Sequence, residues 1–385
     1  MPVDWVARSR RRAVESMARR FLERGGEPSG FRSSDPPSKT RFSGIGGRRP
    51  PSSAPCRPEG RWSVRKPGRS PVGSAPMCPL PSSTPGASLH RPRGERPAGL
   101  ARLRRLVGRT VTRTFEALRG VPPGGMLHRR LLAGLELTGP ELHLARGHAD
   151  LDGLRIAFVS DVHAGFFQTA ADLGALARRI AREAPDLLLL GGDLVGTHGG
   201  ELELFDVFLS LLTPPLGAFA IPGNHDCFYS APRMDLWERF LEERGVTVLC
   251  NRGVRIERGG ATLWLAGVDD LEEGLPDLDA ALTGRREDEP ILLASHHPDL
   301  FVEAARRGID AQLSGHTHGG QIRLLGRAPV THSAHGFDAG PFERNGSHLY
   351  VGRGVGVSFL PLRIGAPPEV PIATLRVGPA SSVRP

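Results

Sequence analysis

Five short segments of the chain carry Asp, Asn and His side chains in patterns that suit metal coordination. They are Ser160-Asp161-Val162-His163, Gly191-Gly192-Asp193, Pro222-Gly223-Asn224-His225-Asp226, Ser295-His296-His297-Pro298-Asp299 and Ser314-Gly315-His316-Thr317-His318-Gly319-Gly320. Carboxylate and imidazole donors together suit borderline divalent ions such as Mn, Fe or Zn. A carboxylate can also bridge two ions that lie about 3.5–4 Å apart, as two-metal hydrolysis requires. Each segment alone is weak evidence, but the five together indicate a metal site.

Each of these segments follows a short apolar run that predicts a buried strand. The runs cover 154–159, 186–190, 217–221, 291–294 and 310–313. Further strands are predicted over 246–249, 254–258, 262–267, 348–352 and 371–376, and helices over 171–184, 201–212, 232–244, 277–282 and 299–307. This alternation predicts an α/β domain. Because sites in open α/β sheets form beyond the carboxyl ends of the strands, we expect the five segments to converge.

The motifs SDVHAG, GGDL, GNHD, SHHPD and GHTHGGQ, taken in this order, resemble those of the calcineurin-like metallophosphoesterases. The resemblance covers about residues 150–378. The tail YVGRGVGVSFLPLRIGAPPEVPIATLRV is similar to one bacterial branch, often exported or attached to membranes, which includes UDP-2,3-diacylglucosamine pyrophosphatases. The resemblance implies a four-layer α/β/β/α sandwich and a hydrolase that acts on ester or phosphoanhydride bonds.

Carried over motif by motif, the resemblance also implies a ligand set for two divalent ions. The residues implied for the first ion are Asp161, His163 and His318, those for the second are Asn224, His296 and His316, and Asp193 would bridge the two. His296 is preferred to His297 because the family motif reads His-x-Pro-Asp. The nearby Asp269-Asp270 pair is expected to form a turn rather than to join the site.

The expected mechanism is hydrolysis of a phosphomonoester, phosphodiester or pyrophosphate bond. Two divalent ions lower the pKa of a bridging water enough to give hydroxide near neutral pH, and the hydroxide attacks phosphorus in line with the leaving oxygen. The GNHD motif places His225 to donate a proton to that oxygen. Many relatives carry an Asp three residues after the bridging one to orient this histidine, whereas this chain has Gly196 there. We therefore expect slower turnover, or a leaving group that needs little protonation.

The positive charge of the chain belongs to its first third. The formal net charge is +9, but residues 1–130 hold 28 Lys and Arg against 8 Asp and Glu, a net of +20, which leaves 131–385 with a net of −11. Residues 1–98 are rich in Arg, Pro, Ser and Gly and are expected to be disordered, because such a segment has little apolar surface to bury. Residues 99–132 are expected to form a basic amphipathic helical segment and linker, and 133–385 the phosphoesterase domain.

The expected partners follow from the resemblance and from this charge pattern. A phosphorylated small molecule or a lipid is the expected substrate, and a nucleic acid is disfavoured because the domain is acidic. Segment 99–120 either lies on an anionic membrane surface or packs on the domain. No apolar run reaches about 18 residues, so no transmembrane helix is expected, and the location is expected to be cytoplasmic, with the membrane contact left open. A nuclease, and a scaffold without activity, are the alternative functions, although every ligand position is filled.

Overall fold

The computed structural model describes residues 124–378, apart from 166, 167, 231, 232, 327, 330 and 359–361, together with the single residues 106, 110, 114 and 117. The expected disordered region 1–98 and most of the expected amphipathic segment 99–120 lie outside the described residues. The four single residues are helical. Helix α3 (Gly124–Ala133) occupies part of the expected linker. Within the described part of the chain, no helix is both long enough and apolar enough to cross a bilayer.

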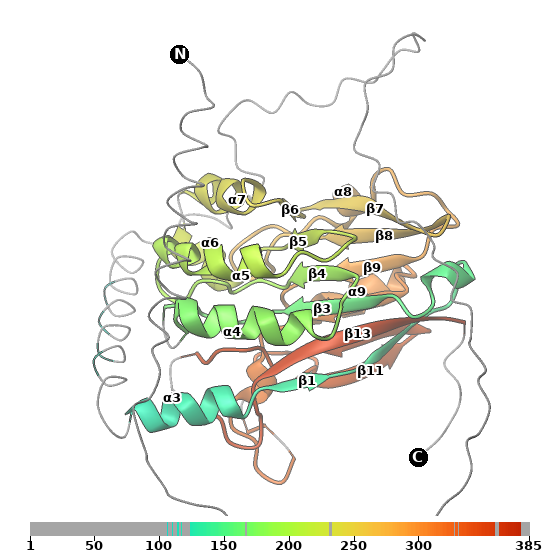
Figure 1. Cartoon of the computed structure of the whole chain (residues 1–385). Coiled ribbons are helices and arrows are strands. Elements are labelled where there is room, and N and C mark those ends of the chain that lie inside the picture. Colours follow the sequence, from blue (N-terminus) through green and yellow to red (C-terminus); the bar gives the residue numbers. More distant parts are fainter. Residues whose placement is uncertain are drawn as a thin grey trace, which may run out of the picture. The chain divides into compact units, whose positions relative to one another are not determined.

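The first of two sheets holds seven strands in the order β1-β13-β3-β4-β5-β6, with β2 also paired to β13. Their bounds are β1 (Glu136–Thr138), β2 (Glu141–Leu144), β3 (Arg155–Val159), β4 (Leu187–Leu190), β5 (Ala218–Ala220), β6 (Val246–Val248) and β13 (Glu369–Val377). Strands β3 to β6 are parallel, and β13 runs antiparallel to β3. The last strand of the chain therefore joins the short first strands to the parallel core of the sheet (Figure 1).

The second sheet holds six strands in the order β11-β12-β10-β9-β8-β7. Their bounds are β7 (Arg252–Arg258), β8 (Ala261–Gly267), β9 (Ile291–Ala294), β10 (Ala311–Ser314), β11 (Gly340–Arg344) and β12 (Ser347–Val351). The four central strands are parallel, and the edge strands β7 and β11 pair antiparallel with their neighbours. Parallel strands that are covered on both faces read as continuous apolar runs, which is why the sequence predicts them well.

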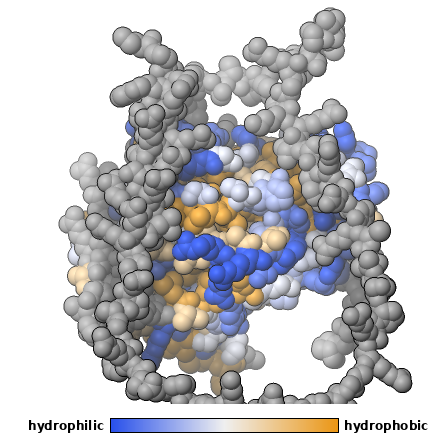
Figure 2. All heavy atoms as spheres, viewed as in Figure 1, coloured by the Kyte–Doolittle hydropathy of each residue, from blue (hydrophilic) through white to orange (hydrophobic). Residues whose placement is uncertain are grey.

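Helices cover the outer faces of both sheets. The remaining α-helices are α4 (Ala170–Ala181), α5 (Phe205–Leu211), α6 (Asn224–Ser230), α7 (Met234–Glu242), α8 (Leu278–Leu282) and α9 (Phe301–Arg306), and the 3-10 helices are η1 (Ala149–Leu151), η2 (Gly199–Leu204), η3 (Pro298–Leu300) and η4 (His318–Gly320). Helix α4 begins at a capping box, in which Thr169 and Asp172 satisfy each other's backbone N–H groups. On the face seen in Figure 2, hydrophilic and hydrophobic side chains lie side by side.

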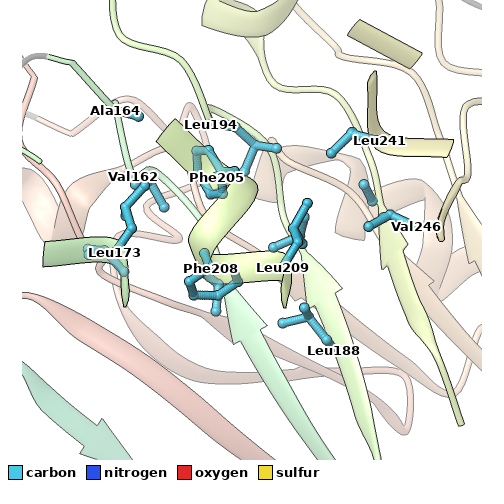
Figure 3. Close-up of a cluster of buried hydrophobic side chains, with 14 of the residues drawn as sticks. Val162, Ala164, Leu173, Leu188, Leu194, Phe205, Phe208, Leu209, Leu241 and Val246 are labelled. Carbon is cyan, nitrogen blue, oxygen red and sulfur yellow. The ribbon is translucent and has the colours of Figure 1, made fainter. Parts of the chain in front are cut away.

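Three hydrophobic clusters separate four layers. Strand β4 shows why, because its four leucines alternate between two cores. Leu188 and Leu190 pack with α4, α5 and α7, where Phe205 and Phe208 fill the space (Figure 3). Leu187 and Leu189 face the second sheet. A third cluster lies between the second sheet and helices α8 and α9. The four-layer α/β/β/α sandwich is thereby confirmed.

The sequence predicted most elements but not all of them. The predicted helix 201–212 is in fact the 3-10 helix η2 followed by α5. Strands β1, β2 and β11, and helices α3 and α6, were not predicted. Helix α6 begins at Asn224, so the GNHD motif forms the first turn of a helix and not only a loop.

Candidate metal centre

The five ligand-bearing segments meet at one place between the two sheets' carboxyl-terminal edges. Three of them follow β3, β4 and β5 of the first sheet, and two follow β9 and β10 of the second. Among the described residues, metal-ligating atoms of three overlapping groups lie within 4.8 Å of one another. The three groups are Asp161–His163–His318, Asp161–Asp193–His296 and His163–Asp193–His225, and a fourth group, Glu272–His297–His316, shares no residue with them.

Asp161, His163 and His318 form one side of the centre. The Nε2 atoms of His163 and His318 are 3.0 Å apart, and His318 Nε2 is 3.5 Å from Asp161 Oδ1. Burial, followed by the nearby His225, lowers the pKa of His163 to about 3. Burial and the neighbouring His163 likewise hold the pKa of His318 well below its usual value. Both imidazoles are therefore neutral, which leaves nitrogen lone pairs for a cation.

Asp193 lies in the middle of the centre. Its Oδ2 is 3.6 Å from His163 Nε2 and 3.4 Å from His296 Nε2, so one carboxylate reaches both groups of ligands. Its Oδ1 accepts a hydrogen bond of 2.8 Å from the backbone N–H of His225. The GNHD glycine makes room for it, because a Cβ on Gly223 would lie 2.3 Å from Asp193 Oδ1. Position 223 therefore requires glycine, because any side chain there would clash with the Asp193 carboxylate.

His296, His316 and Asn224 form the other side. His296 Nδ1 is 2.8 Å from the carbonyl oxygen of Gly191, so Nδ1 donates to that carbonyl and Nε2 is the nitrogen that lies against Asp193. Although burial lowers it, the charges of Asp193 and Asp161 hold the pKa of His296 well above its usual value, so a cation at Nε2 would replace a proton there. His316 Nδ1 is 3.1 Å from Asn224 Oδ1. By contrast, His297 Nδ1 accepts the backbone N–H of Asp299 at 3.2 Å. The structure therefore brings His296, and not His297, against Asp193.

The centre fits cations on its own chemistry. Two buried nitrogens, His296 Nε2 and His316 Nε2, have no hydrogen-bond partner among the described residues. Such orphaned atoms cost free energy unless a ligand satisfies them. Burial raises the pKa of Asp161 to about 6 even though His296 opposes the shift, which shows that its negative charge is poorly compensated. Divalent ions would satisfy the nitrogens and the carboxylates together.

The backbone at the centre is unusual. Five of the seven expected ligands have positive φ, between 47° and 72°, and they are Asp161, His163, Asp193, His316 and His318. Residues other than glycine rarely adopt this left-handed backbone conformation, and each one that does destabilises the fold by of order 1–3 kcal/mol. The strands end in tight left-handed turns that aim the ligands inward, and the surrounding packing holds them there.

His225 lies beside this set. Its ring contacts His163, with centroids 4.5 Å apart, and its Nδ1 is 3.0 Å from the carbonyl oxygen of Gly196. A carbonyl only accepts, so Nδ1 carries a proton and Nε2 is the nitrogen that can take up and release another. The orienting group is therefore a backbone carbonyl, that of Gly196.

Several residues at the centre were not predicted from the sequence. Asp226 is fully buried and accepts backbone N–H groups of Leu194, Val195 and Gly223 at 3.0–3.1 Å, which ties the Asp193 loop to the GNHD turn. Its place in GNHD was the only available signal. Arg363 Nη2 lies 3.1 Å from His318 Nδ1 and also donates to backbone carbonyls around it. That contact spans 45 residues of sequence and has no local signature.

Asp269 and Asp270, which follow β8, form the expected turn. Asp270 Oδ1 accepts the backbone N–H groups of Glu272 and Glu273 at 2.9 and 2.7 Å. The turn also carries Glu272 to the centre, since its Oε1 lies 3.8 Å from His316 Nε2.

Comparison with known proteins agrees with this geometry. Residues 154–320 match the family model described as calcineurin-like phosphoesterase. The chain is 31% identical over 234 residues to the uncharacterized metallophosphoesterase YkuE of Bacillus subtilis, covering 58% of this chain and 80% of that relative. It belongs to the calcineurin-like metallophosphoesterase family. This metallophosphoesterase is also 32% identical over 230 residues to the phosphodiesterase YaeI of Escherichia coli, covering 57% of this chain and 82% of YaeI.

A bovine relative is named as a transmembrane protein with a metallophosphoesterase domain. It is 30% identical over 259 residues, and the match covers 63% of this chain and 57% of the relative. The chain thus spans little more than half the length of that protein. Family membership makes this metallophosphoesterase a hydrolase of phosphoester bonds, and the family uses a dinuclear metal centre.

Proposed function

We propose that this metallophosphoesterase hydrolyses a phosphodiester or a pyrophosphate bond with two divalent ions, Mn, Fe or Zn, held by the seven residues that the family resemblance implies. The first ion would take Asp161, His163 and His318, the second would take Asn224, His296 and His316, and Asp193 would serve both. The observation that carries the proposal is the position of the Asp193 carboxylate, 3.4 Å from His296 Nε2 and 3.6 Å from His163 Nε2. The name of YaeI supports the diester as the bond type.

The chemistry divides between the ions and the chain. When bound, two divalent ions neutralise phosphoryl oxygens and activate a water for attack on phosphorus. The chain's own contribution is a proton for the leaving oxygen, which His225 would hold on Nε2 while its Nδ1–H stays bonded to Gly196. The lowered pKa values of His163 and His318 leave both imidazoles neutral, so their nitrogens would be available to hold the first ion.

Hydrolysis of bis-p-nitrophenyl phosphate tests this proposal. We expect activity that Mn stimulates and that Asp193→Asn abolishes. Asp288→Asn is the matched control, because it removes the same charge from an exposed position. Absence of hydrolysis with every one of Mn, Fe, Zn and Co would refute the proposal.

A lipid-linked or nucleotide-linked substrate is part of the same proposal. Exposed apolar side chains near the centre support the lipid-linked class. Leu324 and Leu325 are 60% and 103% exposed, and they follow the ligand His318 by only a few residues. Ile364, 44% exposed, belongs to a segment that forms a β-bridge with Ile322. Apolar surface beside a phosphoesterase centre suits an acyl chain.

A comparison of substrates tests this class. We expect a higher kcat/KM for UDP-diacylglucosamine than for the deacylated compound, and expect Leu325→Ser to reduce that preference without changing hydrolysis of bis-p-nitrophenyl phosphate. Leu211→Ser is the control, because Leu211 is exposed on α5. Equal rates on both compounds would exclude the lipid-linked class. Single-stranded DNA and RNA belong in the same assay, since cleavage of either would favour the nuclease alternative.

A further inference from the structure

The loop that orients His225 is held by one buried acidic residue. Glu201 is 4% exposed and lies in η2, directly after the loop 196–198. Its Oε2 accepts the backbone N–H groups of Gly196 and Thr197 at 2.7 and 2.8 Å and that of His198 at 3.3 Å. Its Oε1 accepts the hydroxyl of Thr197 at 2.7 Å. One carboxylate therefore fixes three successive peptide groups.

The peptide group between Gly196 and Thr197 leads directly to His225. Glu201 accepts its N–H, that of Thr197, at 2.8 Å, and its carbonyl oxygen, that of Gly196, accepts from His225 Nδ1 at 3.0 Å. Hydrogen bonds to a carboxylate are roughly twice as strong as those between neutral groups. The Gly196 carbonyl, which sets the tautomer of His225, is thus held in place by the hydrogen bonds that Glu201 accepts.

The chain is also built to admit this carboxylate. A Cβ on Gly165 would lie 2.6 Å from the side chain of Glu201, so the glycine of the SDVHAG motif leaves the space that Glu201 fills. The amide of Gly196 itself donates to two acceptors, the carbonyl of Ala164 at 3.2 Å and Glu201. Glu201 therefore links the loop after β3, which carries Asp161 and His163, to the loop after β4.

We propose that Glu201 is the positioning residue for His225, acting through the Gly196 carbonyl. This inference rests on the proposed general-acid role of His225. It predicts that the backbone carbonyl is an adequate orienting group only while Glu201 holds it. A histidine that lost this support would rotate or change tautomer, and its Nε2 would no longer meet the leaving oxygen.

The variant Glu201→Gln tests the proposal, because glutamine keeps the shape but its neutral carbonyl oxygen accepts the three N–H groups more weakly than the carboxylate oxygen Oε2 does. We expect kcat/KM to fall about 10- to 100-fold on diesters with an alkoxide leaving group, and less than about fivefold on bis-p-nitrophenyl phosphate. The stable p-nitrophenolate anion needs no proton as it leaves. A purely structural defect would lower both rates equally and would overturn the proposal.

A double-mutant cycle separates action through His225 from a general effect. We expect Glu201→Gln combined with His225→Ala to be no slower than His225→Ala alone, since residues that act as one unit are not additive. A double variant slower than His225→Ala, by the factor that Glu201→Gln causes alone, would overturn the proposal. Glu203→Gln is the control, because Glu203 is exposed on the same 3-10 helix. Thr197→Val, which removes the hydroxyl bond to Glu201, is a milder variant should Glu201→Gln fail to fold. We expect it to lower the rate on alkoxide diesters more than the rate on bis-p-nitrophenyl phosphate, by a smaller factor than Glu201→Gln does.

A measurement without metal or substrate keeps this inference distinct from the proposed function. The ¹⁵N chemical shifts of the His225 ring report which nitrogen carries the proton. We expect a single Nδ1–H form in the wild type and a mixture of tautomers in Glu201→Gln and Thr197→Val. Identical shifts in all three proteins would overturn the inference even if the wild type is an active phosphodiesterase. A wild type without activity, but with the expected shifts, would refute the proposed function alone.

Discussion

Replacing Asp193 with Asn tests whether one carboxylate serves both ion positions. The change keeps the shape of the side chain, and an asparagine oxygen can still accept the His225 amide that Asp193 Oδ1 accepts at 2.8 Å. Asparagine also tolerates the left-handed backbone at φ +52°. The fold should therefore survive, and the metal-free midpoint of thermal unfolding should stay within about 3 °C of the wild type.

The loss of metal affinity follows from the ligand charges. Only Asp161 and Asp193 carry negative charge among the seven expected ligands, and Asp193 faces both groups. A charged contact contributes about 1.5–3 kcal/mol, so two of them amount to about 3–6 kcal/mol. This corresponds to a loss of about 10²- to 10⁴-fold in the combined affinity for two ions.

Thermal unfolding with and without Mn measures the effect. At about 100 times the wild-type dissociation constant, bound Mn stabilises the wild type by about 2.7 kcal/mol, or about 5–11 °C for a domain of this size. We expect less than about 2 °C for Asp193→Asn at the same concentration and the full shift for Asp288→Asn. An undiminished shift in Asp193→Asn would refute the idea that Asp193 is shared.

Three further predictions concern other residues. Although burial raises the pKa of Glu289, hydrogen bonds from Arg255 and the Arg286 amide lower it to about 2, so its stabilising effect is present above about pH 4.5 and is lost as the pH falls towards 2. We expect Glu289→Gln to reduce the free energy of unfolding at pH 7 by up to about 3 kcal/mol and to flatten its decline at acid pH, as measured by denaturant titration. We expect His296→Ala to reduce bound Mn, measured by metal analysis, and His297→Ala to leave it unchanged, because only His296 faces Asp193. Phe208→Ala should cost about 3–5 kcal/mol of stability in the same titration, because the ring is fully buried.

The central strands and the motif loops could be predicted from the sequence because their signals are local. Strand β4 is a run of four leucines bounded by Asp186 and Gly191, and this is what a strand buried on both faces requires. The short strands β1 and β2 carry polar residues and pair with β13, more than 200 residues away. Their formation depends on that partner, so no local pattern predicts them.

The site residues also divide into those that the sequence predicts and those that it does not. The side chains proposed as metal ligands are identified by residue type, and the structure brings them together. The partner of His225 escaped prediction because a backbone carbonyl belongs to every residue and leaves no trace in the sequence. Glu201 escaped for a related reason, since a glutamate at the start of a helical pattern is ordinarily a solvated end residue.

The place of β13 in the first sheet bears on how the protein is made. This strand pairs with β1, β2 and β3, and it is the last strand of the domain in sequence. While the ribosome is still producing it, β3 lacks its outer neighbour and the loop that carries Asp161 stands at an open sheet edge. Long-range pairing of this kind is slow and exposes edges to aggregation. A nascent chain would therefore hold every ligand residue before it holds a complete centre, and loss of the strand beyond residue 368 would leave the ligands present but the sheet beneath them unclosed.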